Sequence, residues 1–358
     1  MTDSVDAVVL VGGKGTRLRP LTLSAPKPML PTAGVPFLEH LLSRIRAIGV
    51  THVVLGTSYR AETFSEYFGD GSDFGLEIDY VVEETPLGTG GAIRNVYEKL
   101  RADTVMVFNG DILSGVDLSG LLDTHRSNSA DVTLHLVRVA DPRAFGSVPT
   151  DPDGRVQAFL EKTDDPPTDQ INAGCYVFRR SVIEQIPANE VVSVERNTFP
   201  GLLTGGARVW GHVDTSYWLD LGTPAAFVQG SADLVRGSAP TFALPRPVGE
   251  MLALDGAVAA TDAVVTGGTT LGRGVTVGHG ARVEESVLFD GAVVGERAQV
   301  IRSVIGAGAQ IGAGTLIRDA VIGDRAVIGP RCELIDGARV WPDVVLGEAA
   351  VRFSADAS

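Results

Sequence analysis

The residues best suited to chemistry stand between positions 7 and 38, where four cations accompany a glycine-rich stretch. This stretch has no acidic residue, although the whole chain has a formal net charge of -14. Backbone N–H groups beside glycines can approach a phosphate closely, because no side chain stands in the way. The pattern therefore predicts an anion site. Its residues are Gly12, Gly13, Gly15 and Thr16, with the cations Lys14, Arg17, Arg19 and Lys27.

One alternative is a glycine turn with solvated arginines, which would need no ligand. The spacing fits neither the P-loop nor the dinucleotide-binding fingerprint, and Pro20 argues against a long helix after the glycines. The segment Pro26-Lys27-Pro28 favours a ligand, because two prolines are expected to hold the backbone extended and to fix the lysine.

Two aspartates are placed to hold a cation. Asp111 follows the mainly apolar residues 104–108 and an Asn-Gly pair, and Asp220 stands before Gly222 and Pro224. Mg²⁺ prefers one or two carboxylates together with phosphate oxygens. We therefore predict a magnesium site that contains Asp111 and Asp220, with a helix N-cap as the alternative for Asp111.

Other polar residues follow later in the chain. Residues 83–91 form a second glycine-rich turn, which either closes over a flat ring or is only a tight connection. Gly146 stands in a short run where another group could lie against it, and Asn172 begins a strand-like segment. Glu161 and Lys162 are adjacent, and a surface ion pair is the usual interpretation of such a pair.

These residues need a framework, and the apolar pattern predicts a parallel sheet with helices on both faces. The segments run in the order strand 7–11, helix 37–48, strand 51–57, helix 61–68, strand 76–82, helix 92–100 and strands 104–108, 132–139 and 171–178. Ligands of such sheets bind at the carboxyl ends of the strands. The glycine turn and Asp111 both follow a strand, so we expect them at the same edge.

The last third of the chain has a different period. Aliphatic-glycine pairs recur with several spacings of six and of seventeen residues, beginning at Leu271, Val277, Val294, Ile305, Ile311, Ile322 and Ile328. Three short sides per coil predict a parallel β-helix of hexapeptide repeats. We place one domain at residues 1–237, a linker at 238–260 and the solenoid at 261–358.

Composition limits the partners. The chain of 358 residues is long enough for two domains. Its acidic balance argues against nucleic acid and anionic membranes, because both need a broad basic surface. No secretory signal and no membrane-spanning run stand in the sequence, and its two cysteines are far apart. We expect a reduced, cytoplasmic protein.

The order of these motifs is specific. A strand with GGxGTRLRPLT, followed by PKPM, EE-x-PLGT, NGD, F-x-EK, NAG and W-x-D-x-G-x-P, resembles the sugar-phosphate nucleotidyltransferases over essentially the whole chain. The similarity is greatest to members that transfer a guanylyl group to mannose 1-phosphate. It implies an α/β fold, in which a Rossmann-like domain with a mainly parallel mixed sheet precedes a left-handed parallel β-helix.

The resemblance also implies an activity. GTP and mannose 1-phosphate would be the substrates, Mg²⁺ the cofactor, and the enzyme a homo-oligomer, either a dimer or a tetramer. Arg17 would stabilise the departing pyrophosphate, Lys27 the α-phosphate, and Lys162 the sugar phosphate. The nucleoside would lie on Leu10, Gly12 and Gly13, with Gly15 and Thr16 in the same loop, Asp111 near the phosphates and Gly88 against the base. Gly146, Glu161 and Asn172 would face the sugar.

Glu83 bears on the choice of base. Alignment with the family places it where thymidylyl-transferring relatives carry a base-reading glutamine. Guanine presents two neighbouring donors, and a carboxylate accepts at both oxygens. The open alternatives are that Glu84 or the backbone near Gly88 reads the base, and that the enzyme is a thymidylyl- or uridylyltransferase acting on glucose 1-phosphate. Retention of the site charges argues against a non-catalytic regulatory homologue.

Overall fold

The computed structural model describes residues 4–160, 164–244 and 249–352. The chain forms two compact units, each assembled from two stretches. The first unit contains Met1–Gly13 and Leu41–Trp218, and the second contains Lys14–His40 and Leu219–Ser358. The domain boundaries expected from the sequence, at residues 237 and 261, stay a prediction. In the structure, the segment that carries the four cations belongs to the same compact unit as the solenoid.

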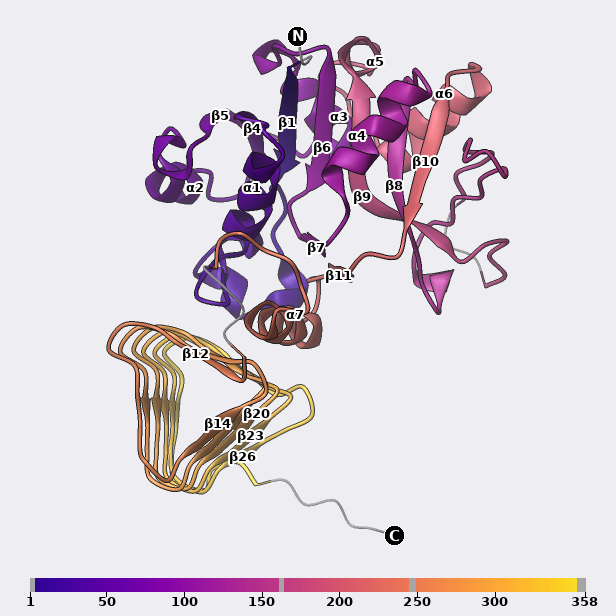
Figure 1. Cartoon of the computed structure of the whole chain (residues 1–358). Helices are drawn as coiled ribbons and strands as arrows, with labels where there is room; N and C mark the ends of the chain where they lie inside the picture. Colours follow the sequence, from indigo (N-terminus) through magenta and orange to yellow (C-terminus); the bar gives the residue numbers. More distant parts are fainter. Residues whose placement is uncertain (1–3, 161–163, 245–248, 353–358) are drawn as a thin grey trace. The chain divides into compact units, whose positions relative to one another are not determined.

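The first unit is built on a seven-stranded sheet (Figure 1). Every neighbouring pair of strands is parallel except those that include β9, which is antiparallel to both of its neighbours. The mixed, mainly parallel sheet is as predicted. Its order is β10 (Val209–Asp214), β8 (Val132–Arg138), β9 (Gln170–Arg179), β6 (Thr104–Asn109), β1 (Val5–Leu10), β4 (His52–Thr57) and β5 (Glu77–Val82).

Apolar residues fill both faces of this sheet. Val8 of β1 lies in one core with Ile93 and Phe199, while Ala7 and Val9, which point the other way, are also fully buried. Such continuous burial is typical of parallel strands covered on both sides. The helices are α1 (Phe37–Ala47), α2 (Glu62–Phe68), α3 (Gly88–Asn95), α4 (Leu118–Ser127), α5 (Arg180–Glu184) and α6 (Phe199–Thr204), with a π-helical turn at Val194–Thr198.

Helix α3 begins at Gly88, four residues before the expected start at 92. The N–H groups of Gly90 and Gly91 donate to the carbonyl of Val192, at 2.8 and 3.2 Å. These glycines therefore form the first turns of a helix that is packed closely against another segment. The sequence pattern had placed them in a loop.

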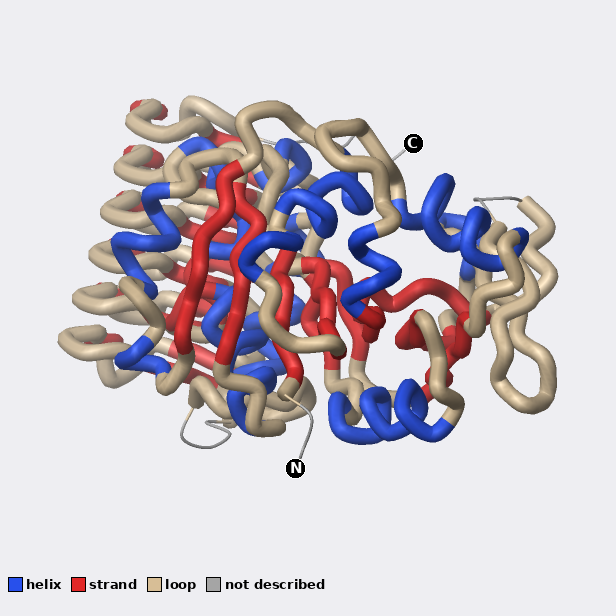
Figure 2. The backbone as a smooth tube through the Cα atoms, turned by 90° about the horizontal axis from the view of Figure 1, so that it is seen from above, coloured by secondary structure: helices blue, strands red, loops and turns tan. Residues whose placement is uncertain are grey.

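The second unit contains helix α7 (Pro224–Arg236) and the solenoid, whose stacked coils are visible in Figure 2. Three sheets of parallel strands form its sides, consistent with the expected left-handed parallel β-helix. The first is β12 (Met251–Ala253), β15 (Thr269–Leu271), β18 (Val287–Leu288), β21 (Val304–Ile305), β24 (Val321–Ile322) and β27 (Arg339–Val340). The second is β13 (Val258–Ala259), β16 (Thr276–Val277), β19 (Val293–Val294), β22 (Gln310–Ile311), β25 (Val327–Ile328) and β28 (Val345–Leu346). The third is β14 (Val264–Thr266), β17 (Arg282–Glu284), β20 (Gln299–Ile301), β23 (Leu316–Arg318) and β26 (Glu333–Leu334).

The register of the solenoid follows the predicted period. Val287 pairs with Val304 and Val304 with Val321, a step of seventeen residues. The aliphatic residues before the repeated glycines point inward and form one buried core. Strand pairing already begins at Met251, earlier than the expected residue 261. Within the described residues, no helix is both long and apolar enough to cross a membrane.

Candidate functional site

In the first unit, the predicted residues gather at the carboxyl ends of neighbouring strands. Beyond β1, the N–H of Val11 donates to the carbonyl of Gly56, and the N–H of Gly110 donates to that of Leu10. The glycine turn and Asp111 therefore leave the sheet side by side. Asp111 stands between β6 and the short strand β7 (Ile112–Ser114), so the alternative of a helix N-cap is wrong. The N-cap of α4 is Asp117.

Glu83 lies over the glycine turn. A Cβ atom built on Gly12 would stand 4.0 Å from Oε2 of Glu83 and 3.1 Å from Oγ of Ser58. Oε1 of Glu83 is buried and has no hydrogen-bond partner among the described residues. Burial raises the pKa of Glu83, and a hydrogen bond from the backbone of Leu87 only partly offsets this. Its neighbour Glu84 is exposed.

Sequence reasoning missed Ser58. The N–H of Gly13 donates to its Oγ at 3.3 Å, which ties the glycine turn to the end of β4. Ser58 directly follows a predicted strand, so the rule that selected Asp111 would have found it.

In the second unit, the cations of the loop lie against the turn before α7. The guanidinium of Arg17 lies against Gly222, because a Cβ on Gly222 would stand 2.8 Å from Nη2 of Arg17. That Cβ would also stand 3.0 Å from Oδ1 of Asp220. Nζ of Lys27 is 3.6 Å from the same oxygen. Arg17, Lys27 and Asp220 therefore form one charged group.

The backbone of the loop is tightly turned. Gly15 has a φ of +55°, a conformation that favours glycine, and the hydroxyl of Thr22 donates to its carbonyl at 2.9 Å. Thr16–Leu18 forms a 3-10 turn, η1, consistent with the expected absence of a long helix. Lys27–Met29 forms another, η3, so the expected extended backbone at Lys27 is wrong. Two hydrogen bonds, from the N–H of Met29 to Pro26 and from that of Leu30 to Lys27, close this turn.

The remaining predicted residues already contact other parts of the chain. A Cβ on Gly88 would meet the carbonyl oxygen of Val192 at 2.7 Å, and one on Gly146 would meet that of Leu160 at 3.1 Å. The side-chain amide of Asn172 donates to the hydroxyl of Tyr176 and to Glu195, at 2.8 and 3.1 Å. Glu195 is a second polar residue that the sequence did not single out. Glu161 and Lys162 lie outside the described residues.

Comparison with known proteins identifies the family. Residues 6–237 match the nucleotidyl transferase family, which is more than half of the chain, and residues 248–319 match the GMPPB C-terminal domain. The chain belongs to the nucleotidyl transferase family. The mannose-1-phosphate guanylyltransferase of Mycobacterium tuberculosis is 66% identical over 99% of both chains.

Two more distant proteins are also similar to this chain. Mannose-1-phosphate guanylyltransferase 1 of Arabidopsis thaliana is 30% identical over 84% of this chain and 85% of its own length. The crystal structure of HddC from Yersinia pseudotuberculosis complexed with GMP-PN has a TM-score of 0.55 and 30% identity, and the match covers 63% of this chain and 97% of HddC. The nucleotidyl transferase part of this chain is therefore similar to a protein solved in complex with GMP-PN.

The fit of a metal ion to this nucleotidyl transferase rests on its carboxylates. Within the described residues, no group of three or more His, Cys, Asp or Glu side chains is gathered as a preformed metal site. Oδ1 of Asp220 is nevertheless buried, and it has no hydrogen-bond partner among the described residues. An unsatisfied carboxylate oxygen is the kind of ligand that Mg²⁺ accepts when phosphates supply the others. The residues present fit such an ion.

A cavity of about 480 Å³ lies elsewhere in the second unit, between α7 and the corners of the solenoid coils. Four of its charged side chains form two ion pairs: Arg236 lies 3.5 Å from Glu285, and Arg302 lies 2.8 Å from Asp319. None of the predicted site residues lines it. We do not assign it to the substrates of the nucleotidyl transferase.

Proposed function

We propose that this chain transfers the guanylyl group of GTP to α-D-mannose 1-phosphate and releases GDP-mannose and pyrophosphate. The observation that supports this most is the 66% identity, over 99% of both chains, to a mannose-1-phosphate guanylyltransferase. The GMPPB C-terminal domain match points to the same reaction.

In the reaction, a phosphate oxygen of mannose 1-phosphate attacks the α-phosphorus of GTP. The bond from this phosphorus to the oxygen that bridges to the β-phosphate breaks, and pyrophosphate leaves with the electron pair. The nucleophile is already an anion, so no general base is needed. The main barrier is repulsion between two polyanions, and fixed cations lower it.

The charged group of the second unit supplies these cations. Arg17 stabilises the departing pyrophosphate, and Lys27 stabilises the charge that develops at the α-phosphate. The contacts that support these roles are those of Arg17 with Gly222 and of Lys27 with Asp220, because they hold both side chains in place before substrate binds. Lys14 belongs to the same loop and is exposed.

The glycine turn and Glu83 would hold the nucleoside. The backbone of Leu10, Gly12 and Gly13 is next to Glu83, whose buried Oε1 lacks a partner among the described residues. The two donors of guanine would satisfy this carboxylate, whereas a pyrimidine would place a carbonyl oxygen against it. This contrast supports guanine as the base.

We assign Mg²⁺ to Asp111 and Asp220. When bound, the ion would neutralise phosphate charge and orient the phosphates. The sugar phosphate is assigned to Lys162, and the sugar hydroxyls to Gly146, Glu161 and Asn172, on the family resemblance alone.

A direct test incubates the purified protein with GTP, mannose 1-phosphate and Mg²⁺ and identifies the products by mass spectrometry. GDP-mannose and pyrophosphate in equal amounts are expected. No GDP-mannose, together with dTDP- or UDP-glucose when dTTP or UTP and glucose 1-phosphate are supplied, would replace this assignment with the thymidylyl- or uridylyltransferase activity.

A further inference from the structure

The loop that carries Arg17 and Lys27 rests on the solenoid. In the second unit, Leu18, Leu21 and Leu30 of the loop are buried in one apolar cluster with residues of α7 and of the solenoid. The solenoid residues of this cluster are Val287, Phe289, Val304 and Val321. Leu18, the immediate neighbour of Arg17, is fully buried there. The outer face of a solenoid sheet therefore supports the loop that carries Arg17 and Lys27.

The exposed fractions of outward-pointing side chains distinguish this face of the solenoid from the face of the second sheet. Val287, Val304 and Val321 stack in register and point away from the coil interior, which their neighbours Leu288, Ile305 and Ile322 fill. Val304 is nevertheless 0% exposed. On the second sheet, the corresponding outward residue Val293 is 39% exposed. The apolar face of the first sheet is thus covered by the loop and α7, whereas the outward residue Val293 of the second sheet is exposed.

A charged side chain from the last coil adds a directional contact. Nη1 of Arg339, in β27, donates a hydrogen bond to the carbonyl oxygen of Arg19 at 2.8 Å. Arg19 is the C-cap residue that follows the 3-10 turn η1. A hydrogen bond from a guanidinium fixes the direction of that carbonyl, and with it the turn that presents Arg17.

Further contacts hold the other end of the loop. The N–H of Ala33 donates to Oγ of Ser231 in α7 at 3.0 Å, and this oxygen lies 3.3 Å from Oγ1 of Thr270 in β15. Both hydroxyl residues are buried. Loop, helix and solenoid are therefore connected in series through buried polar groups.

We propose that the solenoid is a positioning element for catalysis: through Leu18 and Arg339 it sets the placement of Arg17, and hence the rate of guanylyl transfer. Arg339 is assigned no contact with a substrate and is therefore a positioning residue. The proposal rests on the proposed function, in which Arg17 stabilises pyrophosphate.

The test uses full-length protein and compares Arg339→Ala with Arg17→Ala and with the double variant. Arg339→Ala should lower kcat by about fivefold to tenfold, since a small misplacement of a catalytic group is costly. It should also raise KM for pyrophosphate in the reverse reaction, but not KM for mannose 1-phosphate. If Arg339 acts through Arg17, the double variant is no slower than Arg17→Ala alone. Arg339→Lys, which keeps a donor, should recover part of the loss.

A control variant and a matched pair of variants separate an effect on positioning from an effect on stability. Arg325→Ala removes another solenoid arginine, which pairs with Asp343, and should leave kcat and KM unchanged. Val304→Ala should lower kcat at 25 °C, whereas Val293→Ala on the exposed sheet should not. Should Val304→Ala fail to fold, the Arg339 variants still decide the question.

Wild-type kinetic constants in Arg339→Ala would overturn the proposal, as would losses that multiply in the double variant. A failure of the proposed function is distinguishable, because it appears in the wild-type protein as transfer with another substrate pair. The same cycle can then be measured with that pair.

Discussion

Nζ of Lys27 lies 3.6 Å from Oδ1 of Asp220, close enough for attraction between charges but too far for a hydrogen bond. The oxygen is buried, and no hydrogen bond from the described residues reaches it. The nearby lysine attracts this carboxylate, whose buried oxygen has no hydrogen bond from the described residues and can therefore accept a counter-ion of the phosphates. This arrangement supports the assignment of Asp220 as a metal ligand.

Asp220→Asn should lower turnover by at least about 10²-fold, because it removes a fixed charge from the reaction centre. We expect the same of Asp111→Asn. Steady-state kinetics at saturating Mg²⁺ measures the effect, and Asp255→Asn, on the exposed corner of the first solenoid coil, is the matched control. Near-normal turnover of either variant would remove that aspartate from the site.

Gly222→Ala should lower turnover by about tenfold without unfolding the protein. The added Cβ would stand 2.8 Å from Nη2 of Arg17 and 3.0 Å from Oδ1 of Asp220, so both groups must shift. Gly201→Ala is the control, since nothing lies within 4 Å of the new Cβ there. Equal kcat values for the two variants would show that the placement of Arg17 against Gly222 is not important for turnover.

Glu83→Gln should reduce the preference for GTP over dTTP more than it reduces total activity. A mismatched base facing the carboxylate costs on the order of 1–3 kcal/mol, which is roughly tenfold to a hundredfold. The ratio of kcat/KM for the two nucleotides is the measurement. Glu84→Gln, at the exposed neighbour, is the control. An unchanged ratio in Glu83→Gln would assign base reading to other groups.

Parts of this account could be predicted from the sequence because the signals are local. The strand that becomes β1, the glycine turn and the seventeen-residue period each follow from neighbouring residues, and the structure confirms them. Asp111 was placed correctly at a strand end for the same reason. The start of α3 and the turn at Lys27 were wrong, because contacts with Val192 and within the loop outweighed the local glycine and proline preferences.

The contacts that support the loop of Arg17 and Lys27 could not be predicted from the sequence. Leu18 and Val304 are each unremarkable apolar residues, and nothing near either of them in the sequence indicates that they share one cluster. Arg339 contacts a backbone carbonyl 320 residues away. Such contacts depend on how distant parts of the chain pack together in the folded protein, and no periodicity in the sequence predicts them.

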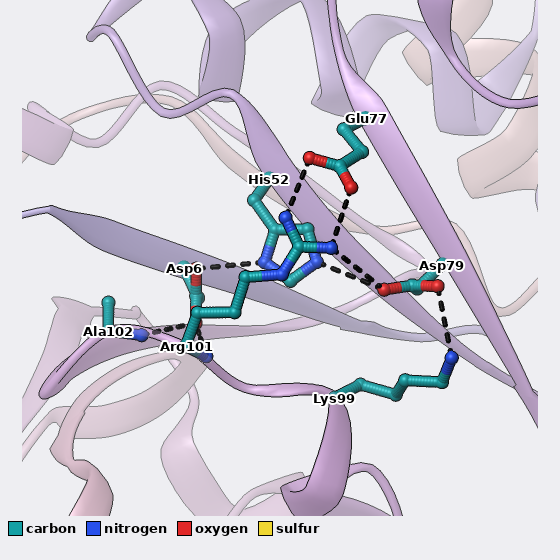
Figure 3. Close-up of polar contacts among 7 residues, drawn as sticks. All are labelled: Asp6, His52, Glu77, Asp79, Lys99, Arg101 and Ala102. Atoms are coloured by element: carbon teal, nitrogen blue, oxygen red, sulfur yellow. Dashed lines mark hydrogen bonds and ion pairs between the residues drawn. The ribbon is translucent and has the colours of Figure 1, made fainter.

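A charged cluster at the amino ends of β1, β4 and β5, opposite the candidate site, was also missed (Figure 3). The ring of His52 lies between Asp6 and Asp79, at 2.9 and 3.2 Å. The hydrogen bond to Asp6 raises the pKa of His52, burial opposes this, and Asp79 adds to the rise. The histidine therefore gains a proton more easily in the folded state than in the unfolded one.

This cluster predicts a pH-dependent stability. A raised folded-state pKa contributes stability that is complete below the unfolded value of about 6.5 and is lost as the pH rises through the folded value. The difference in apparent Tm between wild type and His52→Gln should therefore be largest near pH 6 and shrink toward about pH 9. His279→Gln, at an exposed histidine, is the control. A difference that does not vary with pH would exclude this role of His52.

The proposed activity itself is tested most directly by competition. Wild-type protein is supplied with Mg²⁺, equal concentrations of GTP and dTTP, and equal concentrations of mannose 1-phosphate and glucose 1-phosphate, and the initial rates of all four nucleotide sugars are measured. Because product ratios under these conditions report ratios of kcat/KM, GDP-mannose should form at least about ten times faster than dTDP-glucose. Faster formation of dTDP-glucose than of GDP-mannose would contradict the assignment.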